Sequence, residues 1–492
     1  MASLKILFVT PEIDPYVKVG GLADMVGALP KELAKLGHDV RIVCPLYRSV
    51  KRVGDWQARN EPLGIDVGVA AVWARTWETR LPGTGVPVYF LENEGFFGRD
   101  GVYGDAHSSY PDNDYRFITL CRGALTLCLQ LGWTPEVVHC HDWTTGWVPI
   151  LLNTVLRASR LGGTASVLTI HNLEHQGYAH RRAIPFAHLP ESEFHAASLE
   201  ALGAVNPMKG GLYHATKLTT VSPTYAHEVR TPDGGFGLDH VLRFRGADLI
   251  GILNGIDMAT WDPTTDPTLP AHYGPGSLAG KARCKSALQL RLGLAPEPNV
   301  PVFGVVARLV SQKGLDLLAD ALPRVLSTMR VQFALLGSGE EGLERAFRGL
   351  AERSHGQLGV HIGFDGGLAR LIQAGSDFFV MPSRSEPCGL TQMYAMRYGA
   401  PPVVRATGGL IDTVEQYDER TGEGLGFRFE HATSAALADA IGWACSTYFD
   451  RPAHYTQLQE RGMRRDFSWS RSAASYVDVY RWAIAARTGA PV

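Results

Sequence analysis

Two cations stand close together in a segment that follows an apolar run and precedes a helical pattern. Arg308 and Lys313 belong to the string Ala-Arg-Leu-Val-Ser-Gln-Lys-Gly of residues 307–314. A guanidinium offers a planar fork of donors and a lysine offers a point charge, so the two can converge on one diphosphate. The alternative is a solvated pair of surface cations.

Three further loops in the same half have the composition of ligand-binding loops. Gly337-Ser338-Gly339 allows a ligand to approach the backbone closely. Glu386, in the string Glu-Pro-Cys-Gly-Leu, is either a favourable charge at a helix N-terminus or a partner for a ribose or sugar hydroxyl. Thr407-Gly408-Gly409-Leu410 precedes a helix, and its amides can hold a phosphate.

In the first half, a paired-glycine loop follows the first predicted strand. The string Lys18-Val19-Gly20-Gly21-Leu22 leads into a helical pattern. It is either a plain strand–helix turn or an anion site made by a helix N-terminus and the cation of Lys18. It is not G-x-G-x-x-G, which argues against a nicotinamide or flavin fingerprint here.

Histidines and acids follow two later strands. His139, His141 and Asp142 suggest a metal site, but the two histidines share one strand face with no third ligand near, so a polar rim is the preferred interpretation. Asp142 can then bond a sugar hydroxyl. His171 and Asn172 end the next strand, where they are either structural or part of a site. The D-x-D string of residues 112–114 lies before a helix, and we expect it to be structural.

The elements that position these loops alternate between strand and helix. Strands are predicted over 4–10, 40–44, 137–139, 166–170, 217–221, 302–307, 332–336, 360–363, 378–381 and 402–405. Helical patterns cover 314–329, 340–353, 367–374 and 388–398 in the second half. Ligands of such sheets bind beyond the carboxyl ends of the strands, where all these loops fall. Six such loops together predict a cleft that binds a diphosphate-containing ligand.

The fold class predicted is α/β, with two Rossmann-like domains facing across a deep cleft. We expect an N-terminal domain over 1–253, a C-terminal domain over 254–470 with a hinge near 253–263, and a final helix over 471–492 that crosses back to the first domain.

Composition limits the class of protein. Among 492 residues, 45% are hydrophobic and 20% charged, which excludes a disordered or fibrous chain. A net charge of −2 argues against a dedicated nucleic-acid binder. The N-terminal run Ile6–Val9 is too short for a signal-peptide core, and the seven cysteines are scattered, so we expect a cytoplasmic protein with reduced thiols.

The motifs resemble those of a known family, the bacterial glycogen synthases and plant starch synthases, which are retaining glycosyltransferases. The resemblance spans nearly the whole chain and rests on the strings at 18–24, 112–117, 141–143, 171–173, 209–212, 221–225, 253–257, 308–315, 386–390 and 407–410.

The resemblance implies a GT-B type fold and transfer of glucose from ADP-glucose to the non-reducing end of an α-1,4-glucan, with release of ADP. It implies no metal or other cofactor, and ADP-glucose and glycogen as partners, with no nucleic acid or membrane. Its catalytic residues would be Asp142 near the reacting centre, His171 near the glucose 6-hydroxyl, Arg308 and Lys313 at the diphosphate, and Glu386 at the donor sugar. Substrate-binding residues carried over by position are Lys18, Gly20, Gly21, Asp24, Asn172, Asn254, Cys388, Gly389, Leu390, Thr407, Gly408 and Gly409.

Two positions depart from the patterns of such enzymes. Val19 stands where the family has Thr, so a hydroxyl is lost. Tyr394 stands where related retaining transferases often carry a second Glu, although the bacterial synthases often lack it too. Rival interpretations are a retaining transferase of the same fold that uses UDP-glucose, one of the sucrose synthase or trehalose type, and a catalytically silent glucan-binding protein.

Overall fold

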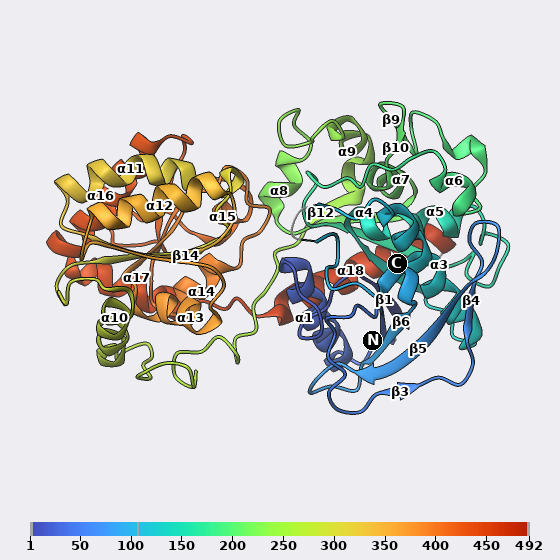
Figure 1. Ribbon diagram of the computed structural model, residues 1–492, viewed down its shortest axis with the longest axis horizontal. Coiled ribbons are helices and arrows are strands. Elements are labelled where there is room, and N and C mark those ends of the chain that lie inside the picture. Colours follow the sequence, from blue (N-terminus) through green and yellow to red (C-terminus); the bar gives the residue numbers. More distant parts are fainter. Residues whose placement is uncertain (1–2, 106–107, 490–492) are drawn as a thin grey trace. The chain divides into compact units, whose positions relative to one another are not determined.

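The computed structural model describes residues 3–105 and 108–489 and separates into two compact units. One holds the described residues up to Gly255 together with those from Trp469 onward, and the other is Ile256–Ser468. Each has its own sheet, with helices on both faces (Figure 1). The two Rossmann-like α/β sheets confirm the predicted fold class.

The sheet of the first unit has the strand order β12-β11-β8-β7-β1-β2-β6-β5-β3, with β4 paired to β5. The strands from β12 to β6 in this order are parallel, and β1 lies at the centre between β2 and β7. The strands are β1 (Lys5–Val9), β2 (Asp39–Pro45), β3 (Gln57–Ala58), β4 (Leu63–Ile65), β5 (Val72–Arg80), β6 (Pro87–Glu92), β7 (Val137–His141), β8 (Ala165–Ile170), β11 (Lys217–Thr220) and β12 (Leu249–Gly251), with β9 (Glu200–Ala201) and β10 (Ala204–Val205) forming a separate ribbon.

Four of these strands, β3 to β6, lie between residues 45 and 136, where the sequence pattern predicts none. The longest, β5, pairs antiparallel with β6 and interleaves buried residues with Arg75, Glu78 and Arg80. A strand with one polar face lacks the continuous apolar run by which fully covered parallel strands are recognised.

The helices of the first unit pack on both faces of its sheet. They are α1 (Gly21–Lys35), α2 (Glu94–Phe97), α3 (Asn113–Gln130), α4 (Asp142–Thr145), α5 (Trp147–Asn153), α6 (Ala183–Phe186), α7 (Pro207–His214), α8 (Pro223–Glu228), α9 (Asp239–Arg245) and α18 (Trp469–Thr488).

The last helix, α18, belongs to the core of the first unit. It contacts α1, β7 and β8, and Figure 1 shows it in red among the strands of this unit. Trp469, Tyr476 and Tyr480 are buried in one cluster with Phe8 of β1. The final helix therefore packs on the first unit, as predicted.

The second unit has a parallel sheet in the order β15-β14-β13-β16-β17-β18. Its strands are β13 (Val302–Val306), β14 (Gln332–Gly337), β15 (Leu358–Ile362), β16 (Phe378–Met381), β17 (Pro402–Arg405) and β18 (Phe427–Phe429). Its helices are α10 (Ala279–Leu292), α11 (Leu315–Thr328), α12 (Glu341–Arg353), α13 (Gly366–Gly375), α14 (Thr391–Arg397), α15 (Gly408–Thr413), α16 (Ser434–Asp450) and α17 (Pro452–Arg464). In Figure 1, α11, α12 and α16 cover one face of the sheet and α10, α13, α14 and α17 the other.

One predicted helix begins too early. The pattern predicts a helix from residue 388, but α14 starts at Thr391. Gly389 has φ 72°, a left-handed conformation that interrupts a right-handed helix. Residues 388–390 therefore form a loop.

The segment that follows the boundary at Ile256 is bound to the second unit. Trp261 stacks on Tyr394 with ring centroids 3.7 Å apart, and Asp262 pairs with Arg397 at 2.6 Å. Tyr394, at the position of the second Glu of related transferases, thus packs against this segment. The hinge near 253–263 stays a prediction.

Among the described residues, no helix has both the length and the apolar character needed to span a membrane.

Candidate functional site

The paired-glycine loop between β1 and α1 is held from beneath by a buried carboxylate. Oε2 of Glu12 accepts the backbone N–H groups of Val19 at 2.6 Å and Gly20 at 2.9 Å, and Oε1 accepts the hydroxyl of Tyr103 at 2.6 Å. Burial raises the pKa of Glu12 against the lowering effect of these hydrogen bonds. The amide of Gly20 is therefore engaged by a carboxylate, and the anion site at this loop stays a prediction.

The cation of this loop is paired as well. Nζ of Lys18 lies 2.5 Å from Oδ1 of Asp24 in the first turn of α1. Burial raises the pKa of Asp24, and the charge of Lys18 opposes that shift. Lys18 remains nearly half exposed, so it can leave Asp24 for a ligand.

Asp142 and His171 meet where β7 and β8 end. Asp142 has φ 52°, which is uncommon for a residue other than glycine. Its Oδ1 accepts the backbone N–H of His171 at 2.7 Å and that of Asn172 at 3.4 Å. Burial raises the pKa of Asp142 to about 7, because a charged carboxylate is disfavoured there.

Three histidines lie side by side at this end of the sheet. Nδ1 of His141 is 3.2 Å from Nε2 of His171, and the rings of His139 and His141 have centroids 4.5 Å apart. His139 bonds the hydroxyl of Tyr480 at 2.8 Å and that of Thr169 at 2.6 Å. Desolvation lowers the pKa of His171 to about 3 and those of His139 and His141 well below the usual value. Neutral rings bonded in this way form a hydrogen-bond network.

No group of three or more His, Cys, Asp or Glu side chains in the described part of the chain is placed to hold a metal ion.

In the second unit, Lys313 and Glu386 are in direct contact. Nζ of Lys313 lies 2.6 Å from Oε2 of Glu386, which also accepts the hydroxyl of Ser383 at 2.9 Å. The loops that carry them follow β13 and β16, adjacent strands of the sheet. Gly314 permits this approach: its φ is 66°, and a Cβ there would lie 2.0 Å from the carbonyl oxygen of Pro382.

The second predicted cation of this loop, Arg308, behaves differently. It is exposed, and its guanidinium forms no hydrogen bond or ion pair with any described residue. The nearby Arg384 instead makes two bonds of 2.6 Å to the carboxylate of Asp316. Arg308 is thus available to a ligand, whereas Arg384 ties two loops together.

The glycine-rich loop at residues 407–409 packs on the loop after Glu386. The N–H of Gly409 donates to the carbonyl oxygens of Glu386 at 3.0 Å and Pro387 at 3.2 Å, so this amide is already engaged. A Cβ at Gly409 would lie 2.2 Å from the carbonyl oxygen of Cys388. The side chain of Gln392 bonds the carbonyl groups of Cys388 and Gly389 at 3.1 and 3.0 Å.

Known proteins resemble this chain over its whole length. Residues 5–244 match the starch synthase catalytic domain, and residues 300–446 match the glycosyl transferases of group 1. Glycogen synthase 1 of Geobacter sulfurreducens is 46% identical over 496 residues, covering 100% of this chain and 99% of that protein. The glycogen synthase of Anaeromyxobacter dehalogenans is 47% identical over 480 residues, covering 97% and 99%. The chain belongs to the glycogen and starch synthase family.

Solved structures agree with this assignment. The catalytic domain of starch synthase IV from Arabidopsis thaliana, bound to ADP and acarbose, aligns with a TM-score of 0.91 and 36% identity, covering 98% of this chain and 100% of that one. A sucrose-phosphate synthase from Thermosynechococcus elongatus aligns with a TM-score of 0.60 at 18% identity, which shows a shared fold. This chain of the synthase family therefore has the GT-B fold.

In this family member, the structure brings some of the predicted site residues into contact in each unit. Asp142, His171 and Asn172 are in contact at the carboxyl ends of β7 and β8, and Lys313 is in contact with Glu386 beside the loops of 388–390 and 407–409. Asn254 follows β12, is buried, and its Oδ1 has no hydrogen-bond partner among the described residues.

Several residues of this synthase-family site were not predicted from its sequence. They are Glu12, Tyr103 and Ser383, whereas His141 was predicted only as part of a polar rim. Glu12 carried a usable signal, because it is an acid just beyond the carboxyl end of a buried strand. Tyr103 reaches Glu12 only through tertiary packing, since 91 positions separate them, whereas Ser383 lies three residues before Glu386 in the same loop.

The D-x-D string has the structural role predicted. Both oxygens of Asp112 bond Arg99, at 2.7 and 2.6 Å, and Oδ1 of Asn113 accepts a hydrogen bond from Arg116 at 2.6 Å.

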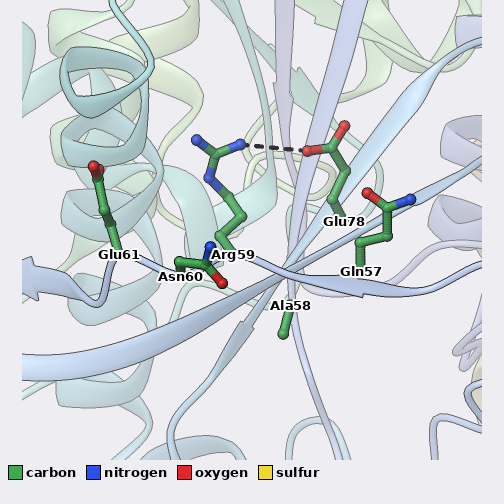
Figure 2. Close-up of a pocket in the computed structure, with 6 residues that line it drawn as sticks. All are labelled: Gln57, Ala58, Arg59, Asn60, Glu61 and Glu78. Atoms are coloured by element: carbon green, nitrogen blue, oxygen red, sulfur yellow. Dashed lines mark hydrogen bonds and ion pairs between the residues drawn. The ribbon is translucent and has the colours of Figure 1, made fainter.

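A polar depression of about 340 Å³ lies apart from these groups. Figure 2 shows its lining of Gln57, Ala58, Arg59, Asn60, Glu61 and Glu78, with Arg59 3.4 Å from Glu78. No predicted site residue lines it.

Proposed function

We propose that this chain is a retaining glucosyltransferase that moves glucose from ADP-glucose to the non-reducing end of an α-1,4-glucan and releases ADP. Full-length identity to glycogen synthases supports the reaction, and the starch synthase IV structure with ADP and acarbose supports the ligands. The observation that carries the proposal is the contact of Lys313 with the buried Glu386, in the loop that also carries the exposed guanidinium of Arg308.

The second unit binds the donor in this proposal. Arg308 and Lys313 contact the diphosphate, and Glu386 and the loop of residues 388–390 contact the sugar. The loop of residues 407–409 lies at a phosphate. When the diphosphate arrives, Lys313 exchanges its carboxylate partner for phosphate oxygens, which leaves Glu386 ready to accept sugar hydroxyl groups.

The first unit binds the transferred glucose and the acceptor. His171 contacts the sugar near its 6-hydroxyl, and Asp142 lies near the reacting centre. Lys18, the glycines of its loop and Asp24 lie against the donor, and Asn172 and Asn254 contact substrate. Since Oδ1 of Asp142 is occupied by backbone amides, its other oxygen is the one that can face the sugar.

The chemistry follows from the charges that develop. As the glucose–phosphate bond breaks, negative charge builds on ADP and positive character builds on the anomeric carbon. Preorganised cations stabilise the leaving group, and loss of one such contact typically costs about 2.7–4 kcal/mol. Retention of configuration favours front-face attack, in which the leaving phosphate accepts the proton of the attacking glucan hydroxyl. We further propose that the two side-chain cations suffice without a metal, and that the protein acts in the cytoplasm.

The experiment is nucleotide release by the purified protein from ADP-glucose or UDP-glucose, each with and without glycogen and with EDTA. Glycogen-dependent release of ADP that survives EDTA is the expected result. Release from UDP-glucose alone would change the donor, and release from neither by a folded protein would favour a silent glucan-binding protein.

A further inference from the structure

One side chain holds the ring of His171. Its Nε2 lies 3.2 Å from Nδ1 of His141, and no described residue bonds its Nδ1. The backbone N–H of His171 is fixed separately, by Oδ1 of Asp142 at 2.7 Å. Two consecutive residues at the end of β7 therefore fix His171, one through the ring and one through the main chain.

His141 is a rigid support. Its side chain is fully buried, and its ring lies against Phe8, with centroids 5.8 Å apart, and His139, with centroids 4.5 Å apart. Its backbone N–H donates to Oγ1 of Thr145 at 2.5 Å. A fully buried ring that packs against two other rings of the sheet cannot turn away from His171 without disturbing the core.

His139, which packs against His141, is itself held by hydrogen bonds. Its Nδ1 bonds the hydroxyl of Tyr480 in α18, and its Nε2 bonds Oγ1 of Thr169, which lies 2.6 Å from Oγ1 of Thr219. Hydrogen bonds therefore fix both ring nitrogens of His139 across the carboxyl half of the sheet.

The hydrogen between the two neutral rings has a preferred side. Nε2 of His141 is buried and has no hydrogen-bond partner among the described residues. A buried N–H without an acceptor is rarer in proteins than a buried acceptor without a donor. The hydrogen of His141 therefore belongs on Nδ1, from which it donates to Nε2 of His171. His171 must then carry its own hydrogen on Nδ1, the nitrogen left open to a ligand.

We propose that His141 is a positioning residue for glucosyl transfer: it fixes the ring of His171 in the Nδ1–H tautomer, so that His171 donates a hydrogen bond to an oxygen of the donor sugar. This inference rests on the proposed function, in which that oxygen is the 6-hydroxyl of the transferred glucose. Asp142 fixes the backbone of His171 through its N–H, and His141 determines which ring nitrogen of His171 can donate a hydrogen bond.

Two substitutions of His141 distinguish loss of its hydrogen bond from loss of its packing. His141→Leu removes the donor but keeps an apolar side chain, and His141→Asn keeps an N–H donor near the position of Nδ1. A displaced catalytic contact can cost about 100-fold, so we expect His141→Leu to lower kcat with ADP-glucose by about 10- to 100-fold. His141→Asn should recover most of that loss. Wild-type kcat in a folded His141→Leu variant would overturn the proposal.

The loss should depend on His171 and on one hydroxyl. In a His171→Ala background, His141→Leu should cause no further loss. With ADP-6-deoxyglucose as donor, wild type and His141→Leu should turn over at similar rates, because the oxygen that His171 contacts is absent. An equal loss with both donors, or an additive loss with His171→Ala, would indicate a merely structural role and contradict the proposal.

A spectroscopic measurement tests the proposal without turnover. In wild type labelled with ¹⁵N-histidine, the His171 signals, assigned by their absence in His171→Ala, should show a protonated Nδ1 and an unprotonated Nε2. Protonation at Nε2 instead would overturn the proposal, even if the leucine variant fails to fold. Failure of the proposed function is recognised separately, because wild type would then release no ADP whatever the tautomer.

Discussion

Removal of the Lys313 charge should separate the catalytic role of this side chain from its structural one. In Lys313→Met the aliphatic stem is kept, and Glu386, only 5% exposed, loses the ammonium at 2.6 Å and keeps the Ser383 hydroxyl at 2.9 Å. A buried group left without its partner costs about 1–3 kcal/mol, so the free energy of unfolding should fall by that amount. The loss at the diphosphate should lower kcat by about 100- to 1,000-fold.

The two effects are distinguished by a second substitution. In Lys313→Met/Glu386→Gln the unpaired buried charge is gone, so urea unfolding should show stability recovered toward wild type, while ADP release stays low. The measurements are denaturation curves and steady-state nucleotide release for the single and double variants. A folded Lys313→Met protein that turns over at the wild-type rate would refute the diphosphate role. A double variant no more stable than Lys313→Met would refute the role assigned to the buried pair.

Three further changes test other parts of the site. Glu12→Gln replaces one acceptor oxygen with a donor, so the glycine loop should loosen and KM for ADP-glucose should rise more than kcat falls in steady-state kinetics. Asp142 has a pKa of about 7 against an ordinary 3.8, so the native state retains a proton that the unfolded chain releases. Wild type should therefore lose stability relative to Asp142→Asn as the pH rises from 3.8 to about 7, and denaturation curves that run parallel would contradict this. Gly409→Ala places a Cβ 2.2 Å from the Cys388 carbonyl oxygen, so it should lower both the melting temperature and the affinity for the donor. An unchanged melting temperature would show that the loop can shift to accommodate the methyl group.

The sequence predicts most of the second unit because its strands are continuous apolar runs. Two of them, β16 and β17, agree with the prediction at both ends, and β13, β14 and β15 differ by one or two residues at an end, whereas β18 was not predicted. Of the strands that were not predicted, β5 alternates buried residues with charged ones and has no such run, whereas β6 is a buried apolar run that the prediction missed. The start of α14 depends on the left-handed backbone of Gly389, which a helical pattern of side chains does not reveal.

Some residues of the candidate site can also be predicted from the sequence. Residues in the loops that follow strands, such as His171 after β8 and Lys313 after β13, can be found from the sequence because parallel strands place their carboxyl ends at one edge. Supporting partners such as Tyr103 and Tyr480 cannot, because those contacts arise from packing between distant segments. Tyr480 and His139, which bond at 2.8 Å, are separated by 341 positions in the chain.

The return of α18 to the first unit also sets an order for biosynthesis. The second unit is one continuous segment, Ile256–Ser468, and all of it is synthesised before Trp469. The first unit is translated first, but its hydrophobic core stays incomplete until Trp469, Tyr476 and Tyr480 have been synthesised. A nascent chain that stops before α18 would lack the hydroxyl that holds His139. The histidine network is therefore complete only after α18 has been synthesised.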